Sequence, residues 1–245
     1  FWVLMAAVRP HRLRNFASYA HGLRTLLDTD FWSVATIVED GHQYWRTYFT
    51  YDGDHQAVPI YTPVFQDAVL ARGYLRTFKV QYLQLRRWAW GVSDFAYVVI
   101  NSIKNPRIPW SNKLVQMGRL FEGHFSWATA SLILSGAAWL PLALNNLLNS
   151  SASNELLVYQ LPVMASRIMQ VTTLALFVTI LLSLISLPPR PKHYGWVKSL
   201  GMVAQWALLP FTATIFGSLA AIDAQTRLIL GKYLDFRVTE KARRR

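Results

Sequence analysis

The chain has 245 residues, of which 53% are hydrophobic and 16% are charged, whereas a soluble domain usually carries about 25% charged residues. The charges are unevenly distributed, because residues 125–187 contain only Glu155 and Arg167. This separation predicts a water-soluble portion joined to a lipid-embedded portion. The net charge of +12 fits Lys and Arg placed beside membrane spans. No zinc-finger, helix-turn-helix or RNA-stacking pattern supports a nucleic-acid partner.

The chain contains no cysteine, which excludes disulfides, thiolate metal sites and cysteine nucleophiles. It starts at Phe1 inside an apolar run and shows no signal-peptide pattern. We therefore expect that an upstream part of the protein is missing from this sequence.

Residues 1–109 predict a mixed α/β domain. Apolar side chains recur at helical spacing in residues 36–50, with Thr36 as a suitable N-terminal cap. The short apolar segment 57–64 is interrupted by Pro59 and Pro63, which predicts an edge strand or an extended segment.

Breaks between elements are marked by Gly and Pro. The Asp52-Gly53 pair predicts a turn, because these residues readily adopt positive φ. Residues 67–104 are compatible with a long helix that is interrupted at Gly73 and Gly91. The sequence Asn-Pro-Arg-Ile-Pro at 105–109 predicts the boundary between the two portions.

Residues 110–123 mix basic with large apolar side chains, which predicts a helix lying in the membrane interface. An ordinary amphipathic helix on a soluble core is the alternative for this segment.

A transmembrane region is predicted at residues 124–222, with spans at about 124–148, 162–187 and 199–222. The connection 149–159 has no Lys or Arg and suits the outer face, whereas the basic connection 188–198 suits the cytoplasm. The final segment, 223–245, is a basic tail. Three complete crossings would put this tail outside, against the positive-inside rule, so the third segment is either re-entrant and bent at Pro210 or followed by an outer tail.

Two short patterns suggest chemistry in the soluble portion. Glu39-Asp40 stands at the start of a predicted helix, and Gln84-Leu85-Arg86-Arg87-Trp88 forms a Q-x-x-R-W sequence about forty residues later. Each pattern alone has an ordinary explanation, since acidic residues at helix starts complement the helix dipole.

Together, in this order and before a membrane region, they resemble the C-terminal half of family-2 glycosyltransferases of the cellulose, chitin and hyaluronan synthase type. The resemblance extends to Glu122-Gly123-His124-Phe125-Ser126-Trp127 and to Phe236-Arg237-Val238-Thr239-Glu240-Lys241. It covers most of the chain from about Asn15 and is closest to uncharacterised bacterial members. It implies the C-terminal part of a GT-A-type α/β domain followed by an interface helix and two to three transmembrane helices.

The resemblance also implies roles for single residues. Asp40 matches the catalytic base, which accepts the proton of the acceptor hydroxyl, and Glu39 would orient it. Gln84 and Arg87 match residues that hold the nucleotide diphosphate, for which the fork of a guanidinium is suited. Trp88 matches the aromatic platform under the acceptor sugar.

The implied activity is inverting transfer of a sugar from a UDP- or GDP-sugar to a glycan or lipid-linked acceptor. It would take place at the cytoplasmic face of a plasma or inner membrane, in a multi-pass protein that contacts lipid. The resemblance implies Mg²⁺ or Mn²⁺ as cofactor, but its D-x-D ligands should lie upstream of this chain. Asp28-Thr29-Asp30 and Asp52-Gly53-Asp54 are therefore interpreted as turns. No metal ligand is predicted within the chain, which we expect to be inactive alone.

Alternatives remain open. Val38 replaces the Thr that commonly precedes the acidic pair in the family, and His42 is interpreted as a polar surface or acceptor-side residue. A transporter-like protein would need ionisable residues inside the spans, for which Arg167 and Asp223 are the candidates. The remaining alternative is a non-catalytic membrane subunit of a polysaccharide-export system.

Overall fold

A computed structural model describes residues 8–15, 18–62, 64, 67–137, 139–140, 143–144, 147, 156–186, 195–236 and 238–241. The chain forms two compact units. The first comprises residues 1–127 and 219–245, and the second comprises residues 128–218.

The fold-class prediction was wrong, because the described residues are mostly helical and none of them lies in a strand or sheet. The only bridge between backbone segments among them joins Leu70 to Lys241. In the segment predicted as an edge strand, residues 57–62 and 64 lie outside any helix or strand. Two prolines deprive this segment of ladder donors, and Ala57 instead packs against a helical core. The described helices do not form the α/β domain that the resemblance implied.

Three helices build the core of the first unit. They are α3 (Glu39–Thr50), α5 (Asp94–Lys104) and α6 (Trp110–Leu132). The buried apolar cluster consists of Tyr44, Trp45, Tyr48, Val98 and Leu120 from these helices and Ile108 from the connection between α5 and α6. Buried aromatic side chains of this size remove large apolar areas from water, so this cluster fixes α3 against α5.

The helix α4 (Tyr74–Ala89) begins directly after Gly73, whose φ of +97° suits glycine. A short 3-10 turn, η2 (Trp90–Ser93), then connects α4 to α5. The interruptions predicted at Gly73 and Gly91 are therefore confirmed. Residues 105–109 separate two helices, since α5 ends at Lys104 and α6 begins at Trp110, whereas the two compact units divide after Trp127.

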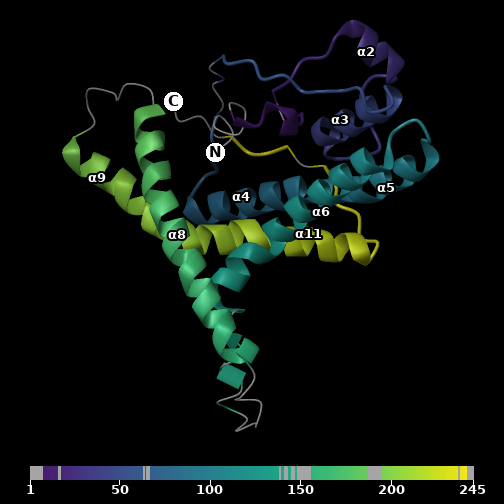
Figure 1. The fold of residues 1–245 in the computed structure, drawn as a ribbon. Coiled ribbons are helices and arrows are strands. Elements are labelled where there is room, and N and C mark those ends of the chain that lie inside the picture. The colour runs from purple at the N-terminus through teal and green to yellow at the C-terminus, as the bar shows by residue number, and fades with distance from the viewer. Residues whose placement is uncertain are drawn as a thin grey trace. The chain divides into compact units, whose positions relative to one another are not determined.

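The last helix, α11 (Leu219–Ile229), runs alongside α4 (Figure 1). Three small side chains make this close approach possible, because Ala220, Ala221 and Ala224 are all completely buried. The segment predicted as the start of a basic tail at residue 223 is thus the second half of a packed helix.

The second unit contains α8 (Leu156–Ser186), α9 (Trp196–Ala204) and α10 (Leu209–Thr212), with the π-helical turns η3 (Ile133–Ala137) and η6 (Ala213–Ser218). Large apolar side chains are exposed along α8, among them Val171, Leu174 and Phe177. A helix that is apolar on all sides suits a lipid environment. Within this unit, Ser131 of α6 hydrogen-bonds Ser218 at 2.6 Å.

Two helices are long and apolar enough to cross a membrane, Gln160–Leu182 and Trp196–Ile229. The first matches the predicted span at 162–187. The second extends the predicted segment 199–222 and includes α11. The predicted span 124–148 overlaps α6 and then runs into residues that lie partly outside the described part of the chain.

Candidate functional site

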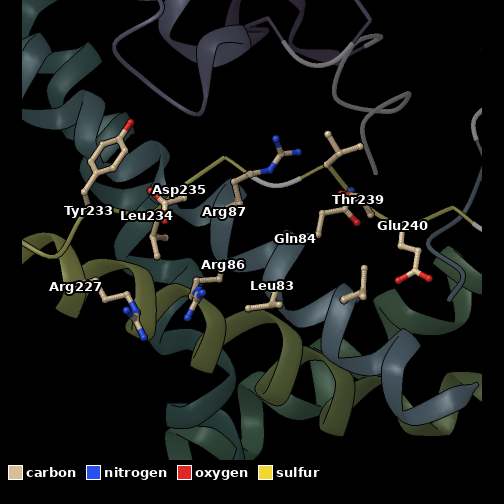
Figure 2. Close-up of a pocket in the computed structure, with 12 residues that line it drawn as sticks. Leu83, Gln84, Arg86, Arg87, Arg227, Tyr233, Leu234, Asp235, Thr239 and Glu240 are labelled. Carbon is tan, nitrogen blue, oxygen red and sulfur yellow. The ribbon is translucent and has the colours of Figure 1, made fainter. Parts of the chain in front are cut away.

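A pocket of about 300 Å³ lies on the side of α4 that carries the Q-x-x-R-W sequence. Gln84, Arg86 and Arg87 line it from α4, and Arg227 lines it from α11. The other wall is the segment after α11, through Tyr233, Leu234, Asp235, Val238, Thr239 and Glu240. In Figure 2, the Arg87 side chain points toward the segment after α11, whereas the Arg86 side chain points toward α11 itself.

The Arg87 guanidinium lies over the ring of Phe236, 4.9 Å from its centroid. Its Nε is buried and has no hydrogen-bond partner within the described part of the chain. A buried N–H of a guanidinium without an acceptor costs free energy, so this atom is ready to bind an acceptor oxygen. Arg87 is therefore the cation of this pocket best placed to hold an anionic ligand.

The neighbouring Arg86 is occupied by a carboxylate. Its Nη1 donates to Asp223 Oδ2 at 2.8 Å, and Arg227 Nε donates to Asp223 Oδ1 at 2.6 Å. The Tyr82 hydroxyl also contacts Asp223 Oδ2, at 3.4 Å. Asp223 thereby joins α4 to α11. Because its carboxylate is paired with two arginines, it gives no support to a transport pathway through the spans.

The segment after α11 is held at both ends. Near its start, the Tyr233 ring meets Trp90 edge-on at 5.7 Å. Near its end, Arg76 Nε donates to Glu240 Oε2 at 2.9 Å, and Leu70 N donates to the Glu240 carbonyl. The sequence predictions assigned none of these tail residues to the site. Their contacts join positions more than 140 residues apart, so local patterns do not indicate them. The one local sequence feature near this segment is the spacing of Asp223 and Arg227 at i, i+4.

Glu39 and Asp40 occupy the first turn of α3, as predicted. The helix starts at Glu39 with Val38 as its cap, and Thr36 instead accepts a hydrogen bond from Val38 N at 3.3 Å. Glu39 is exposed, and Asp40 Oδ1 accepts the Gly41 N–H at 2.7 Å. Neither carboxylate is among the residues described as lining the pocket.

Two contacts are made by residues near the acidic pair, one to the tail and one to α5. Tyr233, which lines the pocket, contacts the Ala35 carbonyl with its hydroxyl at 3.5 Å. His42 Nδ1 lies 2.6 Å from Oδ1 of Asp94, which begins α5. His42 is thus bonded toward the protein interior and is not a surface residue, and the acceptor-side interpretation stays a prediction.

Trp88 lies outside the pocket lining, and its side chain is 48% exposed. An indole exposed to this extent is accessible to a ligand, and the role of Trp88 as a platform for the acceptor sugar stays a prediction.

The described residues do not fit the implied metal ion. They contain no group of three or more His, Asp or Glu side chains that could hold one. Within the two D-x-D sequences, Asp28 bonds Arg24 and Tyr51, while Asp52 bonds Asn105 and Arg107. Asp52 and Gly53 have φ of +51° and +90°, which confirms the predicted turn. The reaction proposed for this chain therefore uses its own side chains and no metal step.

Comparison with known protein families, with curated proteins and with solved structures found no match to this chain. The resemblance described above accordingly rests on the motif residues, and the function is a proposal.

Proposed function

We propose that this chain is part of a membrane glycosyltransferase that uses a nucleotide-sugar donor. The observation that carries the proposal is the buried, unpartnered Nε of Arg87 in a pocket that Arg86 and Arg227 also line. A diphosphate supplies oxygen acceptors and negative charge, and guanidinium groups bind such oxygens in a forked geometry. Gln84 adds an amide donor on the same face of α4.

In the proposed reaction the acceptor hydroxyl oxygen attacks the anomeric carbon of the donor sugar. Asp40 accepts the hydroxyl proton as the new bond forms. The bond from the anomeric carbon to the diphosphate oxygen breaks, and the diphosphate leaves with that electron pair. Arg87 stabilises the charge that develops on the leaving group. A single displacement of this kind inverts the anomeric configuration.

The acceptor in this proposal is a glycan or a lipid-linked sugar, and the reaction takes place at the cytoplasmic face of a membrane. Two features support a membrane setting. Two helices are long and apolar enough to cross a bilayer. In addition, Trp110, Leu114, Phe121 and Phe125 of α6 are exposed and recur at spacings of four and seven residues. That spacing places them on one face of the helix, as a helix lying on lipid requires.

The test uses the full-length protein in membranes with a panel of UDP- and GDP-sugars and Mg²⁺ or Mn²⁺. Release of free nucleotide is measured for the wild type, for Asp40→Asn and for Asp54→Asn. Asp54 is an exposed carboxylate in the turn after α3 and serves as the matched control.

We expect release with one donor in the wild type and in Asp54→Asn, and no release in Asp40→Asn. Release at the wild-type rate in Asp40→Asn would refute the role of Asp40. No release with any donor from folded wild-type protein would refute the proposed function and favour a non-catalytic subunit.

A further inference from the structure

His42 and Asp94 form a nearly buried pair between two elements that are far apart in sequence. The distance from His42 Nδ1 to Asp94 Oδ1 is 2.6 Å, and the two side chains are 13% and 6% exposed. His42 stands two residues after Asp40 on α3, and Asp94 begins the helix that follows the Q-x-x-R-W segment. The pair therefore joins the helix that carries Asp40 to the helix that follows the Q-x-x-R-W segment.

The Asp94 carboxylate lies beside the turn that carries Asp40. A Cβ built on Gly41 would stand 3.9 Å from Asp94 Oδ2, and the Gly41 N–H donates to Asp40 Oδ1 at 2.7 Å. Asp94 thus lies next to Gly41, whose N–H holds the Asp40 side chain.

The imidazole of His42 is held from α5 on two sides. Its ring meets Tyr97 at a centroid distance of 4.5 Å and an interplanar angle of 62°, and its Nδ1 contacts Asp94. An ionised carboxylate only accepts hydrogen bonds, so with Asp94 ionised the proton of this bond lies on His42 Nδ1. The orientation and the tautomer of the ring are both fixed by α5.

Burial raises the pKa of the Asp94 carboxyl, and the hydrogen bond from His42 and the charges of His42 and Arg14 act against this rise. The charge of Asp40 raises it further, so the two carboxyl groups are within electrostatic reach of each other. Replacing a buried polar pair by apolar residues is often neutral for stability, so the fixed geometry of this pair is its more specific property.

We propose that His42 and Asp94 are positioning residues that hold the first turn of α3 against α5, and thereby set the place of Asp40 relative to the pocket at Arg87. The proposal rests on the proposed glycosyl transfer. Neither residue needs to touch the substrate. A displaced base lowers the rate of proton transfer, whereas donor binding at Arg87 is unaffected.

The decisive comparison is between His42→Asn and His42→Gln in the full-length protein. The Asn amide nitrogen takes the place of Nδ1 and can still donate to Asp94, whereas the Gln amide nitrogen takes the place of Nε2. We expect His42→Asn to retain most of the wild-type kcat. We expect His42→Gln to lose about 10- to 100-fold in kcat, with the KM for the donor unchanged.

Asp94 provides the second half of the test. Asp94→Asn keeps an acceptor oxygen and should retain most activity, whereas Asp94→Ala should lower kcat as His42→Gln does. His11→Gln is the matched control, because His11 is exposed. Thermal unfolding of every variant shows which of them remain folded. If only one of His42→Gln and Asp94→Ala remains folded, its kcat tests the proposal. If both unfold, the kcat values of His42→Asn and Asp94→Asn test it.

Each result has a defined meaning. Wild-type kcat in folded His42→Gln or Asp94→Ala would overturn the positioning role. Loss of activity in folded His42→Asn would also overturn it, because His42 would then act through its own Nε2. A rise in the donor KM without a fall in kcat would place the pair at the donor site and overturn the proposal. A wild-type protein without nucleotide release would instead refute the glycosyltransferase proposal itself.

Discussion

The guanidinium of Arg87 lies 4.9 Å from the centroid of the Phe236 ring, which comes from a segment about 150 residues later in the chain. This cation–π contact fixes the side chain of Arg87 at the pocket without neutralising its charge. The tail therefore contributes to the site by orienting the cation that we expect to bind the diphosphate.

Replacing Phe236 should weaken nucleotide binding. Phe236→Leu keeps an apolar side chain but removes the ring face, whose contact with a cation is worth about 0.5–1 kcal/mol at exposed sites. We expect inhibition by free UDP or GDP to require a severalfold higher concentration. Tyr74→Leu, at the exposed start of α4, should leave it unchanged. Equal or tighter nucleotide binding in Phe236→Leu would contradict an orienting role for the ring.

Arg87→Lys tests the geometry of the cation. Lysine keeps the charge but lacks the forked donors, and hydrogen bonds to charged groups contribute about 1.5–3 kcal/mol. We therefore expect nucleotide affinity to fall by about tenfold or more. Arg72→Lys, in the exposed loop before α4, should bind as the wild type does. Calorimetric titration of the full-length protein with UDP or GDP measures both, and unchanged affinity in Arg87→Lys would remove Arg87 from the binding site.

Asp223 should be important for stability. Its carboxylate accepts from Arg86 and Arg227, whose side chains are 18% and 39% exposed. Asp223→Ala leaves both guanidinium groups without this acceptor, at a cost of about 1–3 kcal/mol in the free energy of unfolding. Asp28→Ala, which removes the partner of the largely exposed Arg24, should have a smaller effect. Thermal unfolding of the purified protein compares the two, and equal shifts would show that the α4–α11 contact does not depend on this cluster.

Local signals in the sequence predicted the breaks of the first unit correctly. Gly73 interrupts the helical segment because glycine permits its φ of +97°, and Pro106 disfavours helix at the residue before it. Gly91 lies in the 3-10 turn between α4 and α5. The N-terminal cap of α3 was predicted at Thr36, two residues before the observed cap Val38, since a hydroxyl that accepts an amide N–H can form a turn as well as a cap.

Local sequence patterns were not sufficient to predict the structure of residues 57–64 or the pocket. Residues 57–64 have the apolar composition of a strand, but a strand requires a partner, and the described chain offers none. The wall of the pocket arises from packing of α11 on α4, which depends on Ala220, Ala221 and Ala224 fitting against a helix far away in sequence. A charged i, i+4 pair inside an apolar segment is the one sequence feature that indicated such packing.

A pair of stacked histidines predicts pH-dependent stability. The rings of His21 and His55 lie 6.2 Å apart. Burial lowers the pKa of both, and the charge of His21 lowers that of His55 further. The unfolded chain therefore binds more protons at mildly acidic pH, so stability is present above the ordinary histidine pKa and is lost as the pH falls below it.

We expect the free energy of unfolding to decrease between pH 7 and pH 5, and His55→Gln to reduce this slope. The exposed His11 provides the control variant, His11→Gln, which should keep the wild-type slope. Unfolding midpoints at several pH values measure the effect. An identical slope in His55→Gln and the wild type would show that this pair is not responsible.

The tail should lie on the same side of the membrane as the pocket. The first unit contains both Trp127, where the chain leaves it, and Leu219, where the chain returns. With the first unit wholly on one side of the membrane, residues 128–218 cross the bilayer an even number of times, which three complete spans do not. We expect this arrangement, with segment 199–218 re-entrant and bent at Pro210.

Single introduced cysteines test this topology directly, because the chain contains no cysteine of its own. Val34→Cys and Val238→Cys place thiols at positions that are 101% and 86% exposed in the first unit, and Ser151→Cys marks the connection predicted to lie outside. In intact cells, a membrane-impermeant maleimide should label Ser151→Cys alone, and permeabilisation should add the other two. Labelling of Val238→Cys but not Val34→Cys in intact cells would place the tail outside. This result would refute an even number of crossings by residues 128–218. It would also refute a cytoplasmic pocket that has the tail as one wall.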